Sequence, residues 1–129
     1  MNNWERVRLG EVVKASTDME EPQPGRPYRQ VGVKWWGEGV YERETIDGVA
    51  TAYKEFTRLK ANDLIYNKIW ARNGSVAIVP EALEGCYAST EFPVYRIDSN
   101  RLLPNFLSTL TQMKDFWKKM FGSIFWYQW

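Results

Sequence analysis

Hydrophobic and polar residues alternate along residues 28–36 with the two-residue period of a β-strand. Val31 and Val33 share one side, and Gln30 and Lys34 fall on the other. This period predicts strands because successive side chains of an extended backbone point to opposite faces. The predicted strands cover residues 28–36, 40–46 and 86–98. Pro93 has no backbone N–H to donate, so the last strand is expected at a sheet edge or with a bulge.

The most regular predicted element is a hairpin over residues 62–80, with the sequence NDLIYNKIWARNGSVAIVP. Asn73 and Gly74 favour a two-residue type I′ turn, because both of its central positions need a positive φ. Such a turn pairs Arg72 with Ser75 and fixes the register of the remaining pairs. One face then enters the core, with Ile69, Ala71, Val76 and Ile78. The other face is solvated, with Tyr66, Lys68, Trp70 and Arg72 in a row opposite Ser75, Ala77 and Val79.

Apolar residues recur near the helical period of 3.6 over residues 102–122, with the sequence LLPNFLSTLTQMKDFWKKMFG. This period predicts one amphipathic helix that packs on the core. Lys114, Lys118 and Lys119 fall in its second half, where cations suit the helix dipole. A brief helix is also expected within residues 4–15.

These elements predict an α+β fold: a single domain with a mostly antiparallel, twisted sheet, hairpins and a C-terminal amphipathic helix. A length of 129 residues suits one domain and leaves little room for two. Residues 49–63 could form either a short helix or irregular structure.

The composition excludes several kinds of catalytic and metal site, but it says little about which ligand the protein binds. The formal net charge of +1 shows no basic excess, so a nucleic-acid surface would require local segregation of charge. The chain has no histidine and a single cysteine, Cys86, which excludes Ser-His-Asp and Cys-His pairs, His-ligated zinc and an intrachain disulfide. We expect no catalytic residue and no cofactor. One cysteine favours the reducing cytoplasm, and no signal peptide or membrane-spanning run is visible.

The row containing Lys68, Trp70 and Arg72 has two interpretations. It could be an ordinary solvated face on which the aliphatic stems of the cations shield the indole. Alternatively it could face a nucleic acid, with phosphates at the two cations and a sugar or base against the tryptophan. The segment KWWGEG, residues 34–39, repeats the combination of cation and aromatic residue beside flexible glycines.

Four segments resemble a known family in their order along the chain. They are WERVRLGEVV near the start, LKANDLIYNKIWARNGSVAIVP, GCYASTEFPVYRID, and LLPNFL opening the amphipathic helix. In this order they resemble a target recognition domain of the specificity (S) subunit of type I restriction-modification systems. The resemblance extends from Trp4 to about Gly122.

The resemblance implies a non-catalytic role in a DNA-modifying complex. Such a domain reads one half of a split double-stranded DNA target, while methyltransferase (M) subunits modify adenine and a restriction (R) subunit cuts unmodified DNA. Base reading is expected in the major groove, with supporting phosphate contacts. Together with the face argument, this places the candidate DNA-binding residues at Lys34, Trp35, Trp36, Tyr66, Asn67, Lys68, Trp70, Arg72 and Asn73, with Ser89 and Thr90 as weaker candidates.

The end of the chain departs from the family pattern. Residues 1–122 correspond to the recognition domain, and residues 123–129 form an aromatic tail where a spacer helix would be expected. We therefore expect a lone domain or a truncated or frameshifted product, whose tail could self-associate. Two alternatives stay open: an RNA- or modified-base-binding β-domain that holds a base between tryptophans, and a protein-interaction domain that uses the tail.

Overall fold

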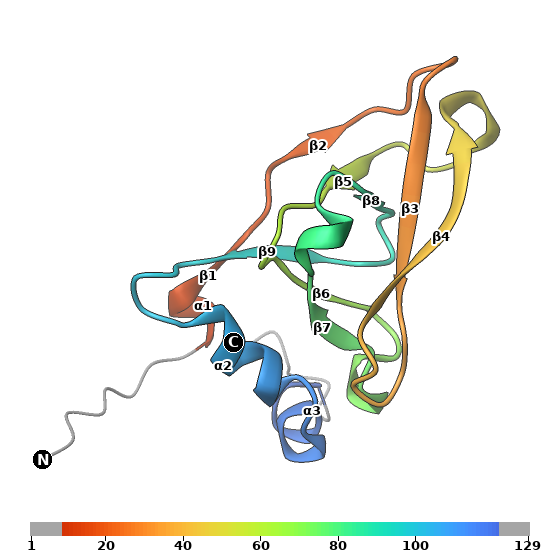
Figure 1. Ribbon diagram of the computed structural model, residues 1–129. Helices are drawn as coiled ribbons and strands as arrows, with labels where there is room; N and C mark the ends of the chain where they lie inside the picture. The colour runs from red at the N-terminus through yellow and green to blue at the C-terminus, as the bar shows by residue number, and fades with distance from the viewer. Residues whose placement is uncertain (1–8, 122–129) are drawn as a thin grey trace, which may run out of the picture.

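The computed structural model describes residues 9–121, which form two β-sheets with short helices (Figure 1). The helical elements are α1 Leu9–Val12, α2 Pro104–Leu110, α3 Lys114–Phe121, and the 3-10 turns η1 Gly48–Ala50, η2 Ala71–Asn73 and η3 Glu81–Leu83. The strands are β1 Val13–Ala15, β2 Met19–Glu20, β3 Pro27–Val33, β4 Val40–Asp47, β5 Phe56–Arg58, β6 Leu64–Tyr66, β7 Val76–Ile78, β8 Tyr87–Ala88 and β9 Val94–Ile97. The predicted α+β class is confirmed.

The two sheets have different strand orders. One has four strands in the order β1-β9-β6-β7, and the other has five in the order β2-β5-β8-β3-β4. Within residues 9–121 the paired strands run antiparallel, except for β3 and β8, which run parallel. The longest pair is β3 with β4, so the predicted strands over 28–36 and 40–46 form one hairpin.

The core lies in layers that follow the alternation of each strand. On β6, Ile65 faces the cluster between the two sheets, whereas Leu64 and Tyr66 face the cluster under the helices. That second cluster also holds Leu107 of α2 and Trp117 of α3. A small aromatic cluster on the five-stranded sheet completes the interior. Figure 1 shows α2 and α3 at one end of the molecule, beside the four-stranded sheet.

The predicted type I′ hairpin is wrong in its register. The structure pairs Tyr66 with Val76, so the strands end there and residues 67–75 form a longer loop. Only Gly74 of the two expected turn residues has a positive φ, of 84°. Ile69, expected in the core, is 65% exposed, whereas Tyr66, expected in the solvated row, is 3% exposed. The three residues expected opposite that row are also buried: Ser75, Ala77 and Val79.

A side-chain cap explains why the strand ends early. Asn67 Oδ1 accepts hydrogen bonds from the backbone N–H groups of Ile69 and Trp70, at 2.8 and 3.1 Å. Asparagine commonly bends the chain in this way because its side chain replaces a backbone acceptor. The backbone N–H of Ala71 then donates to the Asn67 carbonyl at 3.0 Å. The turn at Asn67 therefore competes successfully with the turn at Asn73-Gly74.

The predicted C-terminal helix is divided into α2 and α3. The break lies at Thr111 and Gln112, where the Trp117 indole N–H donates to the Thr111 carbonyl at 2.7 Å. Gly37 packs against the same point, because a Cβ on it would lie 2.8 Å from Gln112 Cα. Lys114 consequently opens α3, whereas only Lys118 and Lys119 occupy its last turn. The break therefore coincides with a contact to the β3–β4 turn. Sequence periodicity cannot reveal such a contact between distant segments.

The predicted strand over 86–98 is also divided. β8 belongs to the five-stranded sheet and β9 to the four-stranded one, so the chain crosses between sheets at residues 89–93. β9 lies between β1 and β6, and the edge position expected from Pro93 is therefore wrong. The proline stands one residue before the strand, where no ladder bond needs its N–H, and its carbonyl accepts from Tyr66 N–H at 3.3 Å.

Some sequence expectations fall outside the described residues. They concern Trp4, Gly122 and the aromatic tail at 123–129. Between residues 9 and 121, no helix has the length and apolar character needed to cross a membrane.

Candidate nucleic-acid interface

Three segments far apart in the sequence are joined by main-chain hydrogen bonds. They are the β3–β4 turn at residues 34–39, the loop at 67–75 and the turn at 89–92. Trp36 N–H donates to the Asn73 carbonyl at 2.8 Å, and Gly37 N–H to the Gly74 carbonyl at 3.0 Å. Lys68 N–H donates to the Glu91 carbonyl at 3.1 Å. These bonds hold the three segments together as one surface, hereafter the three-loop surface.

Gly74 allows the first two segments to approach. Its φ of 84° lies in the left-handed region that glycine adopts without steric cost. A Cβ at this position would lie 2.7 Å from both the Trp36 backbone Cα and the Trp117 ring. Trp36 itself has a φ of 59°, which is unusual for a bulky residue. The chain thus accepts local strain where the two loops meet.

Tryptophans form a continuous cluster across this surface. The rings of Trp35 and Trp70 lie 4.6 Å apart at 35°, and Trp35 meets Trp36 edge-on at 5.8 Å. Trp36 in turn lies 6.2 Å from Trp117, which is buried under it. The exposed fractions are 38% for Trp35, 56% for Trp36 and 39% for Trp70. Large aromatic surface therefore reaches solvent on a buried aromatic support.

Three cations lie on the same segments as these rings: Lys34, Lys68 and Arg72. All three are exposed, and among the described residues none lies within ion-pair distance of a carboxylate. An unpaired cation keeps its full charge available for an anionic ligand. The same segments carry two exposed carboxylates, Glu38 and Glu91, so the surface has an excess of one positive charge.

Arginines elsewhere are paired in a network along the sheets. Arg58 contacts Glu20 at 2.5 Å, and Arg96 contacts Asp63 at 2.6 Å. Burial raises the pKa of Asp63, although backbone and arginine contacts oppose the shift. For Glu20, burial would raise the pKa, but hydrogen bonds from Tyr87 and Tyr28 and two nearby arginines lower it below its ordinary value. These charges bind one another.

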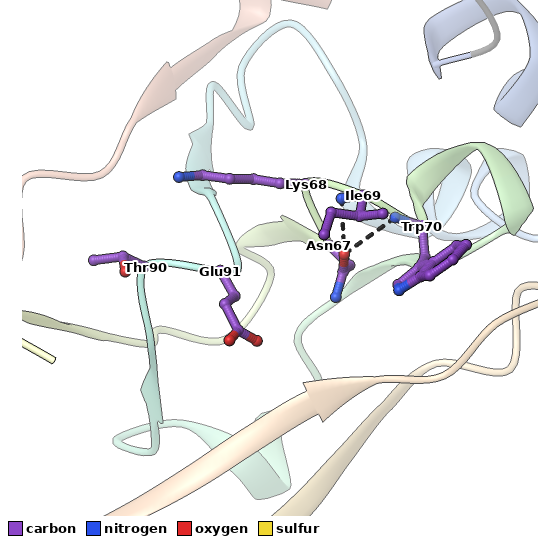
Figure 2. Close-up of a pocket in the computed structure, with 6 residues that line it drawn as sticks. All are labelled: Asn67, Lys68, Ile69, Trp70, Thr90 and Glu91. Carbon is purple, nitrogen blue, oxygen red and sulfur yellow. Dashed lines mark hydrogen bonds between the residues drawn. The ribbon is translucent and has the colours of Figure 1, made fainter. Parts of the chain in front are cut away.

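A pocket of about 280 Å³ opens on the three-loop surface (Figure 2). It is lined by Asn67, Lys68, Ile69, Trp70, Thr90 and Glu91. In Figure 2 the Lys68 side chain runs toward the Thr90 side, and the Glu91 carboxylate points away from it. The pocket presents a cation, a carboxylate, an amide and an indole to one ligand.

The structure brings together most of the residues that the sequence singled out. Eight of them contribute side chains or backbone to the three-loop surface: Lys34, Trp35, Trp36, Asn67, Lys68, Trp70, Arg72 and Asn73. Thr90 joins them by lining the pocket. Tyr66 and Ser89 do not, because both side chains are buried.

Sequence reasoning missed Ile69, Glu91 and Trp117 in this region. Ile69 was assigned to the core by the wrong hairpin register, and Trp117 was assigned only to helix packing. Glu91 lies in a segment that was expected to be a continuous strand, so no signal pointed to it. The family-like segment GCYASTEFPVYRID contains Glu91, but only Ser89 and Thr90 of that segment are candidate DNA-binding residues from the sequence.

Comparison with known proteins agrees with this architecture. The chain matches the type I restriction modification DNA specificity domain over residues 1–125. No curated protein matches it. The HsdS subunit from Thermoanaerobacter tengcongensis is similar, with 26% identity and a TM-score of 0.67 over 81% of this chain and 28% of that one. A structure that describes complex assembly and conformational transition of the type I R-M system has 28% identity and a TM-score of 0.64, over 82% of this chain and 28% of that one.

This chain therefore spans 28% of the length of each of those two proteins. The match over residues 1–125 covers nearly all of its own length. The chain belongs to the type I restriction-modification DNA specificity domain family.

Proposed function

We propose that this chain recognises double-stranded DNA in a sequence-specific manner through the three-loop surface. One observation supports this proposal most directly: on the same loops lie a solvent-exposed pair of indoles in contact and three cations that have no carboxylate partner among the described residues. Phosphates need cations that are not already neutralised by carboxylates, and bases or sugars need apolar or aromatic surface. The family match indicates that the nucleic acid is DNA, because the family is described as a DNA specificity domain.

Separate roles in DNA binding follow from the chemistry of the side chains. Lys34 and Lys68 are suited to phosphate contacts, since a lysine ammonium is a compact charge on a flexible stem. Arg72 and Asn67 carry planar donor groups that can distinguish base edges in the major groove. Trp35 and Trp70 provide apolar surface for sugar or base packing. We expect the lysines to set affinity and the planar groups to contribute to sequence preference.

The wider assembly is proposed from family membership. We propose that the domain, residues 1–122, reads one half of a bipartite target, and that methyltransferase and restriction subunits modify and cut the DNA. The chain itself would be non-catalytic and would need no cofactor. Cys86 is free and buried, which is compatible with the reducing cytoplasm where we place the complex.

The test is a selection of binding sequences from randomised duplex DNA with the purified chain at fixed salt. Salt must be held constant because phosphate contacts dominate raw affinity. Enrichment of a motif of about three or four base pairs supports the proposal, since a single small module reads a short half-site. Failure to enrich any motif would contradict sequence-specific reading by this chain.

A second candidate is single-stranded RNA or a modified base held by the tryptophans. The observation that favours it is Trp36, which is 56% exposed, meets Trp35 edge-on and could hold an unpaired base against its ring. Competition distinguishes the two: unstructured RNA should displace bound duplex DNA at a lower nucleotide concentration than an unrelated duplex does only if this second function is correct. A protein-interaction role for the aromatic tail concerns residues outside the described range.

A further inference from the structure

Two exposed carboxylates, Glu38 and Glu91, lie within the three-loop surface, and neither forms an ion pair among the described residues. Glu91 is exposed and lines the same pocket as Lys68 and Trp70 (Figure 2). Among the described residues Glu91 forms no ion pair. It does not pair with Lys68 even though the Lys68 backbone N–H donates to the Glu91 carbonyl. A carboxylate at this place would repel phosphates, so it works against simple backbone binding.

The turn that carries Glu91 is anchored on both sides. Phe92 N–H donates to the Ser89 carbonyl at 3.0 Å, and the side chains of both residues are buried. Thr90 and Glu91 therefore project outward from the two central positions of a tight turn. The Glu91 carbonyl accepts from Lys68 N–H, which ties the turn to the neighbouring loop. The backbone beneath the carboxylate is thus held in place.

The carboxylate itself is also oriented. The Tyr53 hydroxyl donates a hydrogen bond to Glu91 Oε1 at 2.6 Å. This bond, reinforced by burial, raises the pKa of Tyr53, so the phenol stays protonated and remains a donor at neutral pH. The second oxygen, Oε2, accepts no hydrogen bond from the described residues. One acceptor is therefore left for a ligand.

A donor lies beside this acceptor in the pocket. Asn67 Oδ1 is occupied by the backbone N–H groups of Ile69 and Trp70. The Asn67 Nδ2 amino group is consequently the free end of the amide, with two hydrogens to donate. The pocket thus presents a carboxylate acceptor and an amide donor together, a combination that matches a mixed donor and acceptor pattern.

DNA offers such a pattern only on its base edges. Phosphate oxygens and most sugar atoms accept hydrogen bonds, whereas the exocyclic amino groups of adenine and cytosine donate them in the major groove. In the major groove, a carboxylate can therefore gain a hydrogen bond only by meeting one of these amino groups. Thymine and guanine present a carbonyl at the equivalent place and would be repelled.

We propose that Glu91 is a specificity-determining residue that accepts a hydrogen bond from the exocyclic amino group of adenine or cytosine in the major groove. Tyr53 is its positioning residue. This inference rests on the proposed DNA-binding function and names the base chemistry that one part of the three-loop surface reads.

The substitution Glu91→Gln gives a directional test. Tyr53 keeps one end of the side chain as an acceptor, so the amide oxygen takes that bond and the amino group faces the ligand. The variant should invert the preference at one position, from adenine toward guanine or from cytosine toward thymine, by about 10-fold. It should also bind unrelated duplex DNA more tightly than wild type, because a negative charge is removed.

Two variants control the result. Glu81→Gln removes an exposed carboxylate on η3 that does not line the pocket and should leave the preference unchanged. Tyr53→Phe frees the carboxylate to rotate and should weaken the preference without inverting it. Thermal unfolding of each variant confirms that it is folded.

The experiment selects motifs from randomised duplex DNA with the full-length chain and with each variant. Inversion at one position with Glu91→Gln, and not with Glu81→Gln, supports the proposal. The same motif for wild type and Glu91→Gln overturns it while leaving the proposed function intact. Absence of any motif with the wild-type chain overturns both. Duplexes that lack the 6-amino group of adenine or the 4-amino group of cytosine at that position then identify which base is read.

Discussion

Cations in this molecule have two opposite kinds of surroundings. Along the sheets, Arg58 is paired with Glu20 of the neighbouring strand β2 at 2.5 Å, and Arg96 with Asp63, which directly precedes β6. On the three-loop surface, Lys68 and Arg72 are exposed on the loop that carries Trp70, without a carboxylate partner among the described residues. The first group satisfies its charges within the protein, and the second leaves them for a ligand. Whether a cation has a carboxylate partner therefore indicates its role, in stability or in binding, more clearly than its charge does.

The largest expected effect comes from breaking a pair in the first region. Arg96→Met leaves the carboxylate of Asp63, which is 1% exposed, with its backbone bond to Lys60 N–H but without its arginine. We expect the free energy of unfolding to fall by about 3 kcal/mol, because an uncompensated buried charge is costly. Urea denaturation measures this loss.

The matching double variant refines that test. Asp63→Asn combined with Arg96→Met should recover part of the lost stability, since the buried charge is removed with its partner. DNA affinity of the folded protein should stay unchanged in both variants. Loss of DNA binding without loss of stability would show that Arg96 binds DNA and does not stabilise the fold.

Gly74→Ala should have an intermediate effect on both properties. Its positive φ and the close Trp36 backbone leave no place for a methyl group, and such strain costs about 2 kcal/mol. DNA affinity should fall as well, because Trp36 must move. The matched control is Gly25→Ala, where φ is also positive, at 81°, but no atom lies within 4 Å of the added carbon. Equal effects on DNA binding would show that the contact between loops is unimportant.

Removing single cations from the second region should change affinity and leave stability intact. Lys68→Ala should weaken binding to all duplex sequences by about fivefold and lower the salt slope by about one. The free energy of unfolding should change by less than about 0.5 kcal/mol, as is usual for exposed side chains. Arg72→Ala should also alter base preference. Lys14→Ala, which removes an exposed cation from β1, is the control and should bind like wild type.

The smallest expected effect is a pH dependence of stability that originates in the first region. The pKa of Glu20 lies below its ordinary value of 4.5 in the folded protein. Its contribution to stability is therefore complete above pH 4.5 and is lost as the pH falls through the lowered pKa. Glu20→Gln should flatten the acid side of the stability curve measured by urea denaturation. An unchanged curve would show that Glu20 does not stabilise the fold.

The sequence predicted those parts of the molecule that depend on local periodicity. The strands around Val31 and Val40, the α+β class and the apolar face of the C-terminal helices are present in the structure. The hairpin register was wrong because two asparagine turns competed, and the side-chain bonds of Asn67 prevailed over the turn at Asn73. Two local signals of similar strength cannot be ranked without their tertiary contacts.

The candidate site shows the same limit. Cations and tryptophans were selected for their residue types, and the three loops bring most of them together. Tyr66 is buried because β6 turns its side chain inward, and Ser89 is buried at the start of the 89–92 turn. Glu91 was missed because a carboxylate has meaning here only beside Lys68 and Asn67, and that proximity arises from contacts between loops.

The bonds between the three loops have a consequence for how this surface can change. They join main-chain atoms: Trp36 to Asn73, Gly37 to Gly74, and Lys68 to Glu91. Most residue types carry the same backbone N–H and carbonyl groups, so the side chains that face the ligand can be exchanged while these bonds persist. Engineering a new binding preference should therefore require replacement of outward side chains alone, with Gly74 and the buried Trp117 kept as the fixed frame.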